Sequence, residues 1–361
     1  MVLEKDLRDE ATANAVSGTR TRDRVSDVQC APMKELGLEP GTMVAETYRI
    51  VRPLGAGGMG LVTLAHDEKL DRDVAIKFIR PELFRHEKLR TALLHEARAM
   101  ARVSHPNVLT VHALGEHQNI PYFVMEYIEG TTVEQWLLEQ TAGGAAPDVD
   151  EAFHIFDQVC QGVVAIHEAS TVHRDLKPSN ILIDAQGRVY VSDLGVARIL
   201  EEHTRGGASA YVVGSAAYMA PEAALGDETT PELFVRRDVY ALGCIAYELF
   251  TGHPPFDGPT DIALMSKHLL EPPPLATSLR PDLAPAWDPV LAKSVAKDPL
   301  GRWPGAAELR AAVAQVHASD AEPTRILIAD DDPDWRELLH TQLAARFPAA
   351  TIETVGDGEA A

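Results

Sequence analysis

Cysteine is scarce in this chain, which has three cysteines among 361 residues and no Cys-x-x-Cys pair. So low and odd a count excludes a disulfide framework and argues against a cysteine-based zinc site. Cys160 and Cys244 lie in apolar stretches, so we expect both in the core of a protein from a reducing compartment.

Long apolar runs are absent as well. The longest, from Val239 to Phe250, contains Glu248 and is shorter than the about 18–20 residues that a membrane span needs. The first ten residues lack the apolar segment of a secretory signal. We therefore expect a soluble, cytoplasmic protein without a membrane span.

Positive charge is in the minority. Lys and Arg number 33 against 54 Asp and Glu, which gives a formal net charge of −21. So acidic a chain is not expected to bind nucleic acid or anionic membranes. Its hydrophobic residues, 45% of the total, are sufficient for a substantial core.

The residue pattern divides the chain into successive parts. Residues 1–46 are polar and lack periodicity, which predicts a flexible leader. Alternating, strand-like segments dominate residues 47–129, and apolar helical stripes dominate residues 130–316. A polar linker, 317–324, leads to a strand–helix–strand pattern in residues 325–361. The two central parts predict a β-rich lobe and an α-helical lobe with a cleft between them.

A glycine-rich segment follows the first predicted strand. Gly55, Gly57 and Gly60 fit the pattern GxGxxGxV, which ends at Val62. Alone, the pattern fits a Rossmann dinucleotide-binding turn, a phosphate-covering flap between two strands, or an ordinary hairpin. A Walker A loop is excluded, because no Gly-Lys-Ser/Thr follows. The alternating residues after Gly60 favour the flap, whose backbone N–H groups lie over phosphates.

The most specific segment is HRDLKPSN, residues 173–180, followed by Asp193-Leu-Gly. It supplies a carboxylate base, a lysine and two metal ligands, the set that phosphoryl transfer requires. Upstream, Val-Ala-Ile-Lys77 ends an apolar strand, and Glu96 on the next predicted helix is the carboxylate that would hold its ammonium group. An ordinary surface lysine is the alternative for Lys77.

With Ala-Pro-Glu222 and Arg302, these motifs occur in one order, and the chain resembles eukaryotic-type (Hanks-type) protein kinases, in particular bacterial serine/threonine kinases, over about residues 48–316. The resemblance implies an α+β, bilobal protein kinase fold over residues 47–316. It also implies an enzyme of bacterial signal transduction that transfers the γ-phosphoryl group of ATP, with Mg²⁺ or Mn²⁺, to Ser or Thr hydroxyls of proteins. Lys177 is typical of the Ser/Thr kinases rather than the tyrosine kinases.

Carried over residue by residue, the resemblance implies the catalytic roles. Asp175 accepts the proton of the substrate hydroxyl, and Lys177 stabilises the charge of the γ-phosphate. Lys77 binds the α- and β-phosphates while it pairs with Glu96. Asn180 and Asp193 are the implied metal ligands, and the implied nucleotide contacts are Leu54, Gly55, Gly57, Gly60, Val62, Ala75, Lys77, Met125, Glu126, Ile128 and Leu182.

Other positions are implied to have structural or regulatory roles. Glu222 is expected to pair with Arg302, and Asp238 is expected to bond the backbone of the turn at His173 and Arg174. An arginine just before the catalytic Asp typically binds a phosphate on the activation loop, the segment that leads to Glu222. The candidate phosphosites there are Ser209, Thr204 and Ser215.

Residues 325–361 resemble the beginning of a response-regulator receiver domain, a flavodoxin-like α/β fold. Asp330 and Asp331 end the first predicted strand, where receivers bind Mg²⁺. The alternative is an ordinary Asp-capped helix with Pro333 at its first position. The third strand and its phosphoacceptor aspartate are absent. We therefore expect an incomplete, loosely ordered β-α-β unit that does not accept phosphate.

Two functions of other classes compete with an active kinase. A pseudokinase or scaffold would bind nucleotide without phosphoryl transfer, but every catalytic position holds its usual residue type. A phosphorelay adaptor would act through the receiver segment, which lacks the acceptor. The sequence leaves the oligomeric state open; related bacterial kinases often form a homodimer that autophosphorylates in trans.

Overall fold

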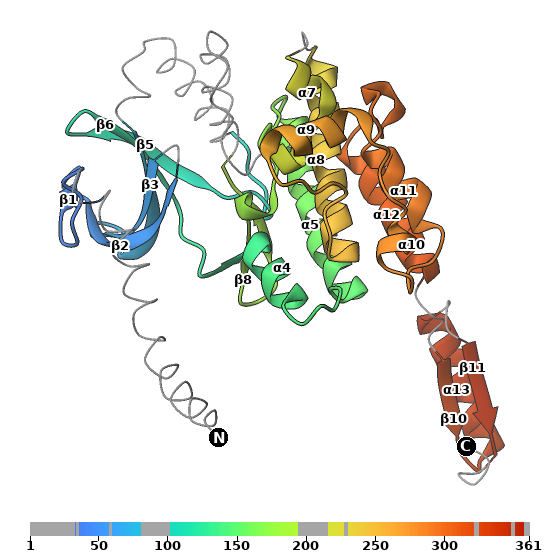
Figure 1. Cartoon of the computed structure of the whole chain (residues 1–361). Helices are drawn as coiled ribbons and strands as arrows, with labels where there is room; N and C mark the ends of the chain where they lie inside the picture. The colour runs from blue at the N-terminus through green and yellow to red at the C-terminus, as the bar shows by residue number, and fades with distance from the viewer. Residues whose placement is uncertain are drawn as a thin grey trace, which may run out of the picture.

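The computed structural model describes residues 33, 36–57, 60–80, 102–193, 216–226, 230–320, 325–347 and 351–356. Within them, a curled antiparallel sheet forms one lobe, helices form most of the other, and a small strand–helix–strand unit follows (Figure 1). The bilobal architecture expected from the sequence is therefore present.

The first lobe is built on a six-stranded antiparallel sheet in the order β1-β2-β3-β4-β6-β5. Alternation along β4 gives this sheet two different faces: Val74, Ile76 and Phe78 join one apolar cluster, whereas Ala75 and Ile79 join another. The strands are β1 (Met43–Val44), β2 (Tyr48–Gly57), β3 (Gly60–Asp67), β4 (Arg72–Ile79), β5 (Val111–His117) and β6 (Ile120–Glu126).

The folded lobe begins before residue 47, where the sequence placed its boundary. Met33, Leu38 and Val44 are at most 1% exposed and pack in the cluster that contains Val74 and Phe78. Strand β1 also pairs with β2. The expected flexible leader is thus wrong for Met33 and residues 36–46. Its few apolar residues are irregularly spaced, so they gave no periodic signal.

The second lobe is built around two of its own long helices, α5 and α8. Their apolar residues are at the centre of the largest core cluster. A three-stranded sheet, β7-β8-β9, is part of this lobe. The elements are β7 (Gly130–Thr132), α4 (Val133–Thr141), α5 (Val149–Glu168), η1 (Pro178–Asn180), β8 (Ile181–Asp184), β9 (Val189–Val191), η2 (Ala216–Tyr218), α7 (Pro221–Leu225), α8 (Pro231–Thr251), α9 (Asp261–Leu270), α10 (Ala276–Leu279), α11 (Trp287–Ser294), η3 (Pro299–Gly301) and α12 (Ala306–Asp320).

A short backbone pairing joins β9 to the segment that precedes β5. Val191 N donates to Asn107 O at 2.9 Å, and Leu109 N donates to Val191 O at 2.9 Å. The Asn107 side chain also donates to Val189 O at 2.9 Å. This pairing fixes the end of β9, and therefore the start of the Asp193 segment, against the chain that enters the first lobe.

Helix α12 continues through Asp320, so the expected linker at 317–324 is wrong for residues 317–320. His317 stacks on Phe153 with ring centroids 4.0 Å apart. Trp287 Nε1 donates to Asp320 Oδ2 at 2.6 Å. These side-chain contacts extend a helix whose polar sequence alone predicted a linker.

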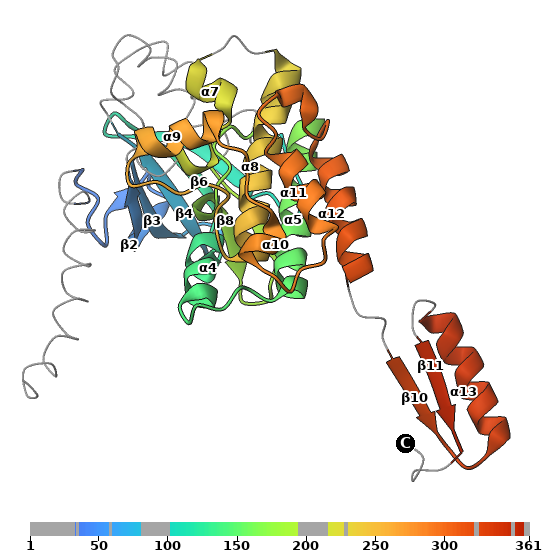
Figure 2. The ribbon, with the colours of Figure 1, turned by 45° about the vertical axis from the view of Figure 1, so that its right-hand side comes forward.

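The last unit contains β10 (Arg325–Ala329), α13 (Pro333–Arg346) and β11 (Thr351–Val355), as the residue pattern predicted. The two strands pair in parallel, which requires the intervening crossover helix. Asp332 caps α13 by accepting from Asp334 N at 2.9 Å. In Figures 1 and 2 the unit stands apart from the helical lobe. Across the described part of the chain, no helix combines the length and apolarity needed to cross a bilayer.

The buried segment before β1 gives a stability prediction. Leu38 is 0% exposed, so Leu38→Ala should lower the free energy of unfolding by about 2–5 kcal/mol through lost burial and the cavity left behind. Leu70 is 63% exposed, and Leu70→Ala in the same lobe should change it by less than about 0.5 kcal/mol. Urea denaturation of both variants measures the difference, and equal small losses would contradict the packing of this segment.

Candidate active site

One apolar cluster contains all the apolar side chains assigned to the nucleotide. Ala75 and Met125 are buried members, and Leu54, Val62, Ile128 and Leu182 pack against them. Leu182 comes from β8 of the helical lobe, whereas the first four come from strands of the sheet. An apolar wall that draws on both lobes suits a flat, largely apolar ring such as a purine.

Lys77 lies on the same face of β4 as Ala75 and is 7% exposed. Its Nζ donates to Asp193 Oδ1 at 2.6 Å. Burial raises the pKa of Asp193, but the charge and hydrogen bond of Lys77, with the charge of Lys177, outweigh burial and hold this pKa below its usual value. Asp193 is therefore ionised at neutral pH. Glu96, the expected partner of Lys77, lies outside the described residues.

Three predicted catalytic residues meet in the catalytic loop, residues 173–180. This loop faces the segment after β9 that contains Asp193. Lys177 Nζ lies 2.9 Å from Asp175 Oδ2. Asn180 Nδ2 donates to both Asp175 O, at 2.8 Å, and Asp175 Oδ2, at 3.1 Å. Since Nδ2 faces Asp175, the amide oxygen of Asn180 is its atom for a metal. Asp175 is thus oriented by two neighbours on its own loop.

Asp238, on α8, holds the turn that begins this loop. Its carboxylate accepts from His173 N at 2.7 Å and from Arg174 N at 2.8 Å. Arg174 has φ of 69°, a conformation that L-residues rarely adopt and that these bonds stabilise. His173 accepts from Asp175 N through Nδ1, so its Nε2 carries the proton and donates to Ser192 O at 2.8 Å. One histidine therefore ties the catalytic loop to the segment of Asp193.

The three glycines of the GxGxxG segment lie at the end of β2 and the start of β3, and they differ in their surroundings. A Cβ on Gly60 would lie 1.8 Å from Phe78 O, whereas a Cβ on Gly55 or Gly57 would meet nothing within 4 Å. Gly60 is therefore required by strand packing. Gly55 and Gly57 leave space beside the loop backbone, which suits a ligand that approaches the main chain closely. Arg80 Nη2 donates to Gly57 O at 3.0 Å, a contact that no sequence signal indicated.

The family model of the protein kinase domain matches residues 48–303 of the sequence, which include every residue discussed so far in this site. The chain belongs to the protein kinase family. It is 35% identical over 293 residues to serine/threonine-protein kinase PknB of Mycobacterium leprae, covering 80% of this chain and 46% of that protein. It is 35% identical over 293 residues to serine/threonine-protein kinase PrkC of Bacillus subtilis, covering 81% and 44%.

The kinase domain also resembles solved structures. The PknI kinase domain of Mycobacterium tuberculosis matches with a TM-score of 0.61 and 28% identity, covering 77% of this chain and 99% of that domain. The chain spans about half the length of the curated relatives it matches.

On the helical side of the kinase cleft, two more side-chain pairs position η2 and α7. Arg302 donates to both carboxylate oxygens of Glu222, at 2.9 and 2.8 Å, and is 1% exposed. Tyr218 donates to Glu248 Oε2 at 2.7 Å. Burial, with the nearby charge of Glu134, raises the pKa of Glu248 to about 7. The sequence had marked Glu248 only as an interruption of an apolar run.

Two of the implied nucleotide contacts, Glu126 and Ile128, lie at the end of β6 and just after it. Glu126 N donates to Thr110 O at 2.9 Å, and Ile128 packs against the cluster of Met125. The phosphosite candidates Ser209, Thr204 and Ser215 lie outside the described residues.

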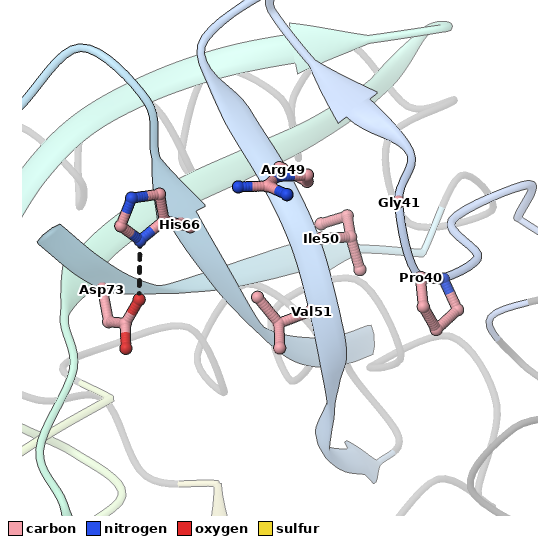
Figure 3. A pocket seen from close by; sticks show the side chains of 7 residues that line it. All are labelled: Pro40, Gly41, Arg49, Ile50, Val51, His66 and Asp73. Atoms are coloured by element: carbon pink, nitrogen blue, oxygen red, sulfur yellow. Dashed lines mark hydrogen bonds and ion pairs between the residues drawn. The ribbon is translucent and has the colours of Figure 1, made fainter. Parts of the chain in front are cut away.

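A pocket of about 420 Å³ lies elsewhere on the first lobe (Figure 3). None of its residues was assigned to the catalytic site, and His66 Nδ1 lies 3.0 Å from Asp73 Oδ1 within it. The pocket is lined by Pro40, Gly41, Arg49, Ile50, Val51, His66 and Asp73.

Mutation can distinguish the structural role of Gly60 from the ligand-binding role expected of Gly55. Gly60→Ala should destabilise the first lobe by about 1–3 kcal/mol or more, because its Cβ meets the Phe78 carbonyl. Gly55→Ala should keep the wild-type unfolding temperature and raise the KM for ATP several-fold. Thermal unfolding and ATP titration of both variants measure this. Equal destabilisation by the two would show that the open space beside Gly55 is not available.

The raised pKa of Glu248 predicts a pH dependence. Burial favours the protonated form of Glu248. The stability that this protonated side chain contributes is therefore complete below about pH 4.5 and is lost as the pH rises to about 7. Glu248→Gln keeps a neutral group beside Tyr218 and should lose that decline. The difference in unfolding temperature between wild type and variant, measured from pH 5 to 8, should grow with pH in favour of the variant. A constant difference would contradict the raised pKa.

Proposed function

We propose that this chain is an ATP-dependent serine/threonine protein kinase. Two sets of polar side chains beside the apolar cluster of Ala75 and Leu182 carry the proposal. In the first set Lys77 pairs with Asp193, and in the second Asp175 contacts Lys177 and Asn180. Phosphoryl transfer depends on positioning and on electrostatic stabilisation, which this set supplies. The named Ser/Thr kinase relatives and Lys177 support Ser and Thr as acceptors.

The donor set fits ATP with a divalent cation. Asp193 and Asn180 offer a carboxylate and an amide oxygen, hard ligands that suit Mg²⁺ or Mn²⁺. Two protein ligands are appropriate, because Mg²⁺ in such sites keeps water and phosphate oxygens as its other ligands. When bound, the cation would supply charge neutralisation at the phosphates.

The residues of the chain have separate tasks in the proposed reaction. Asp175 Oδ2 accepts the proton of the attacking hydroxyl, and the Asn180 amide keeps that carboxylate oriented. Lys177, already beside Asp175, places a positive charge next to the attacked group. Lys77 provides the second positive charge from the sheet side, where 7% exposure limits competition from water.

Regulation by autophosphorylation is part of the proposal. Arg174 would bind a phosphate on Ser209, Thr204 or Ser215, added by a second copy of the kinase in trans. The proposed substrates are proteins with Ser or Thr acceptors. The proposed location is the cytosol, where ATP is supplied.

The β10-α13-β11 unit is a second, smaller proposal. We infer that it corresponds to the beginning of a receiver domain. The parallel pairing of its strands and the position of Asp330 and Asp331 directly after β10 support this inference.

Labelled-ATP autophosphorylation with Mg²⁺ tests the proposed activity. Wild type should incorporate label on Ser or Thr, and Asp175→Asn should reduce the rate by at least about 100-fold through loss of the base. Asp157→Asn is the matched control, because Asp157 pairs with Arg310 away from the cleft and should retain the wild-type rate. Incorporation by Asp175→Asn at the wild-type rate, or none by wild type that binds ATP, would overturn the proposal.

A further inference from the structure

An arginine just after β4 contacts the glycine segment at the end of β2. Arg80 Nη2 donates to Gly57 O at 3.0 Å, although 23 positions separate the two residues in the sequence. Gly57 is the last residue of β2, and Arg80 directly follows Ile79, the last residue of β4. The hydrogen bond therefore connects the ends of two strands.

These two strands are not neighbours in the sheet, because β3 lies between them. Gly57 is opposite Gly60 of β3, and Gly60 is opposite Ile79 of β4. Gly60, the residue of β3 in this row, has no side chain that could occupy the path from Arg80 to the Gly57 carbonyl. Arg80 thus spans β3 and holds the end of β2 directly to the end of β4.

The strand that Arg80 extends also carries the lysine assigned to the phosphates. Lys77 precedes Arg80 by three positions, and its Nζ points to Asp193 in the cleft. The glycine segment is the part of the chain assigned to cover the same phosphates. The hydrogen bond from Arg80 therefore fixes the covering backbone of Gly57 relative to Lys77.

The backbone at Gly57 has few constraints of its own. A Cβ on Gly57 would meet nothing within 4 Å, so the space beside this residue is open. Glycine also has more conformational freedom than any other residue. One charge-assisted hydrogen bond to its carbonyl, stronger than a neutral one, therefore has a large effect on where this backbone lies. Holding a binding segment in place before the ligand arrives improves affinity, because less freedom is lost on binding.

Arg49, on β2, provides a matched comparison within the same lobe. Its Nε donates to Glu68 Oε1 at 2.6 Å, and both side chains are largely exposed. Arg49 lines the pocket shown in Figure 3, which contains none of the residues assigned to the cleft. Replacing Arg49 by Gln removes one positive charge from this lobe without removing a contact of the glycine segment.

We propose that Arg80 is a positioning residue for the phosphate groups of the nucleotide, because it holds the glycine segment over the place where Lys77 binds them. This inference rests on the proposed function, in which ATP is the ligand. Arg80 acts through the backbone of Gly57 rather than by contact with the phosphates. The apolar cluster of Ala75 and Leu182, which is assigned to the adenine ring, does not depend on this hydrogen bond.

A series of ligands with and without phosphates tests this role. Dissociation constants for adenosine, for ADP with Mg²⁺ and for ATP with Mg²⁺ are measured for wild type, Arg80→Gln, Arg80→Lys and Arg49→Gln. Amide hydrogen exchange of the peptide that contains Gly55, Gly57 and Gly60 is followed in the absence of nucleotide. The KM for ATP, kcat and the unfolding temperature are measured for the same four proteins.

Arg80→Gln should bind adenosine as tightly as wild type but bind ADP and ATP about three- to tenfold more weakly, because a hydrogen bond from a charged group is lost. Its KM for ATP should rise by a similar factor with a smaller change in kcat, and its glycine segment should exchange amide hydrogens faster. Arg80→Lys, whose ammonium group can still donate to Gly57 O, should recover part of the loss. Arg49→Gln should match wild type in the binding and exchange measurements.

Four results would overturn the inference. The first is equal affinity of wild type and Arg80→Gln for ADP and ATP. The second is weaker binding of both with unchanged amide exchange, since Arg80 would then act on the phosphates by its charge alone. The third is an equal loss in Arg49→Gln, and the fourth is an equal loss of adenosine binding. Failure of wild type to bind ATP would overturn the proposed function itself, and this inference with it.

Discussion

The carboxylate of Asp238 is the group on which the rest of the catalytic geometry depends. It is 1% exposed and accepts the N–H groups of both His173 and Arg174, while His167 Nε2 lies 2.9 Å from it. A buried carboxylate is tolerated only when such donors satisfy it, and the donors in turn keep Arg174 in its rare backbone conformation. The two most central features of the lobe, helix α8 and the catalytic loop, are therefore joined by one side chain.

In the cleft, each important carboxylate is already paired with a lysine. Lys77 pairs with Asp193, and Lys177 with Asp175. Removing one member of such a largely buried pair leaves the other charge without compensation, so we expect single changes there to be severe. The pairs also place positive charge where phosphates are expected, so that little rearrangement is needed on binding.

Much of this site followed from the sequence, because its motifs are local. The alternation of β4 separates Ala75 and Lys77 from Ile76, and the HRDLKPSN segment holds its base, lysine and amide within one loop. Contacts between distant segments gave no such local signal, and the pairing of Glu222 with Arg302 was expected only from the family resemblance. Neither the packing of Leu38 against the sheet nor the hydrogen bond from Arg80 to Gly57 O has a periodic or spaced pattern.

The sequence by itself determined the family, the two lobes and the chemical identity of the catalytic groups, since these reside in residue types at fixed short spacings. Only the tertiary structure decided which glycine is needed for strand packing and which leaves space beside the loop. It also decided where the folded lobe begins and that Arg80 reaches Gly57 O across β3. These properties arise when segments distant in sequence are brought into contact, and contact depends on the packing of the whole core rather than on local preference.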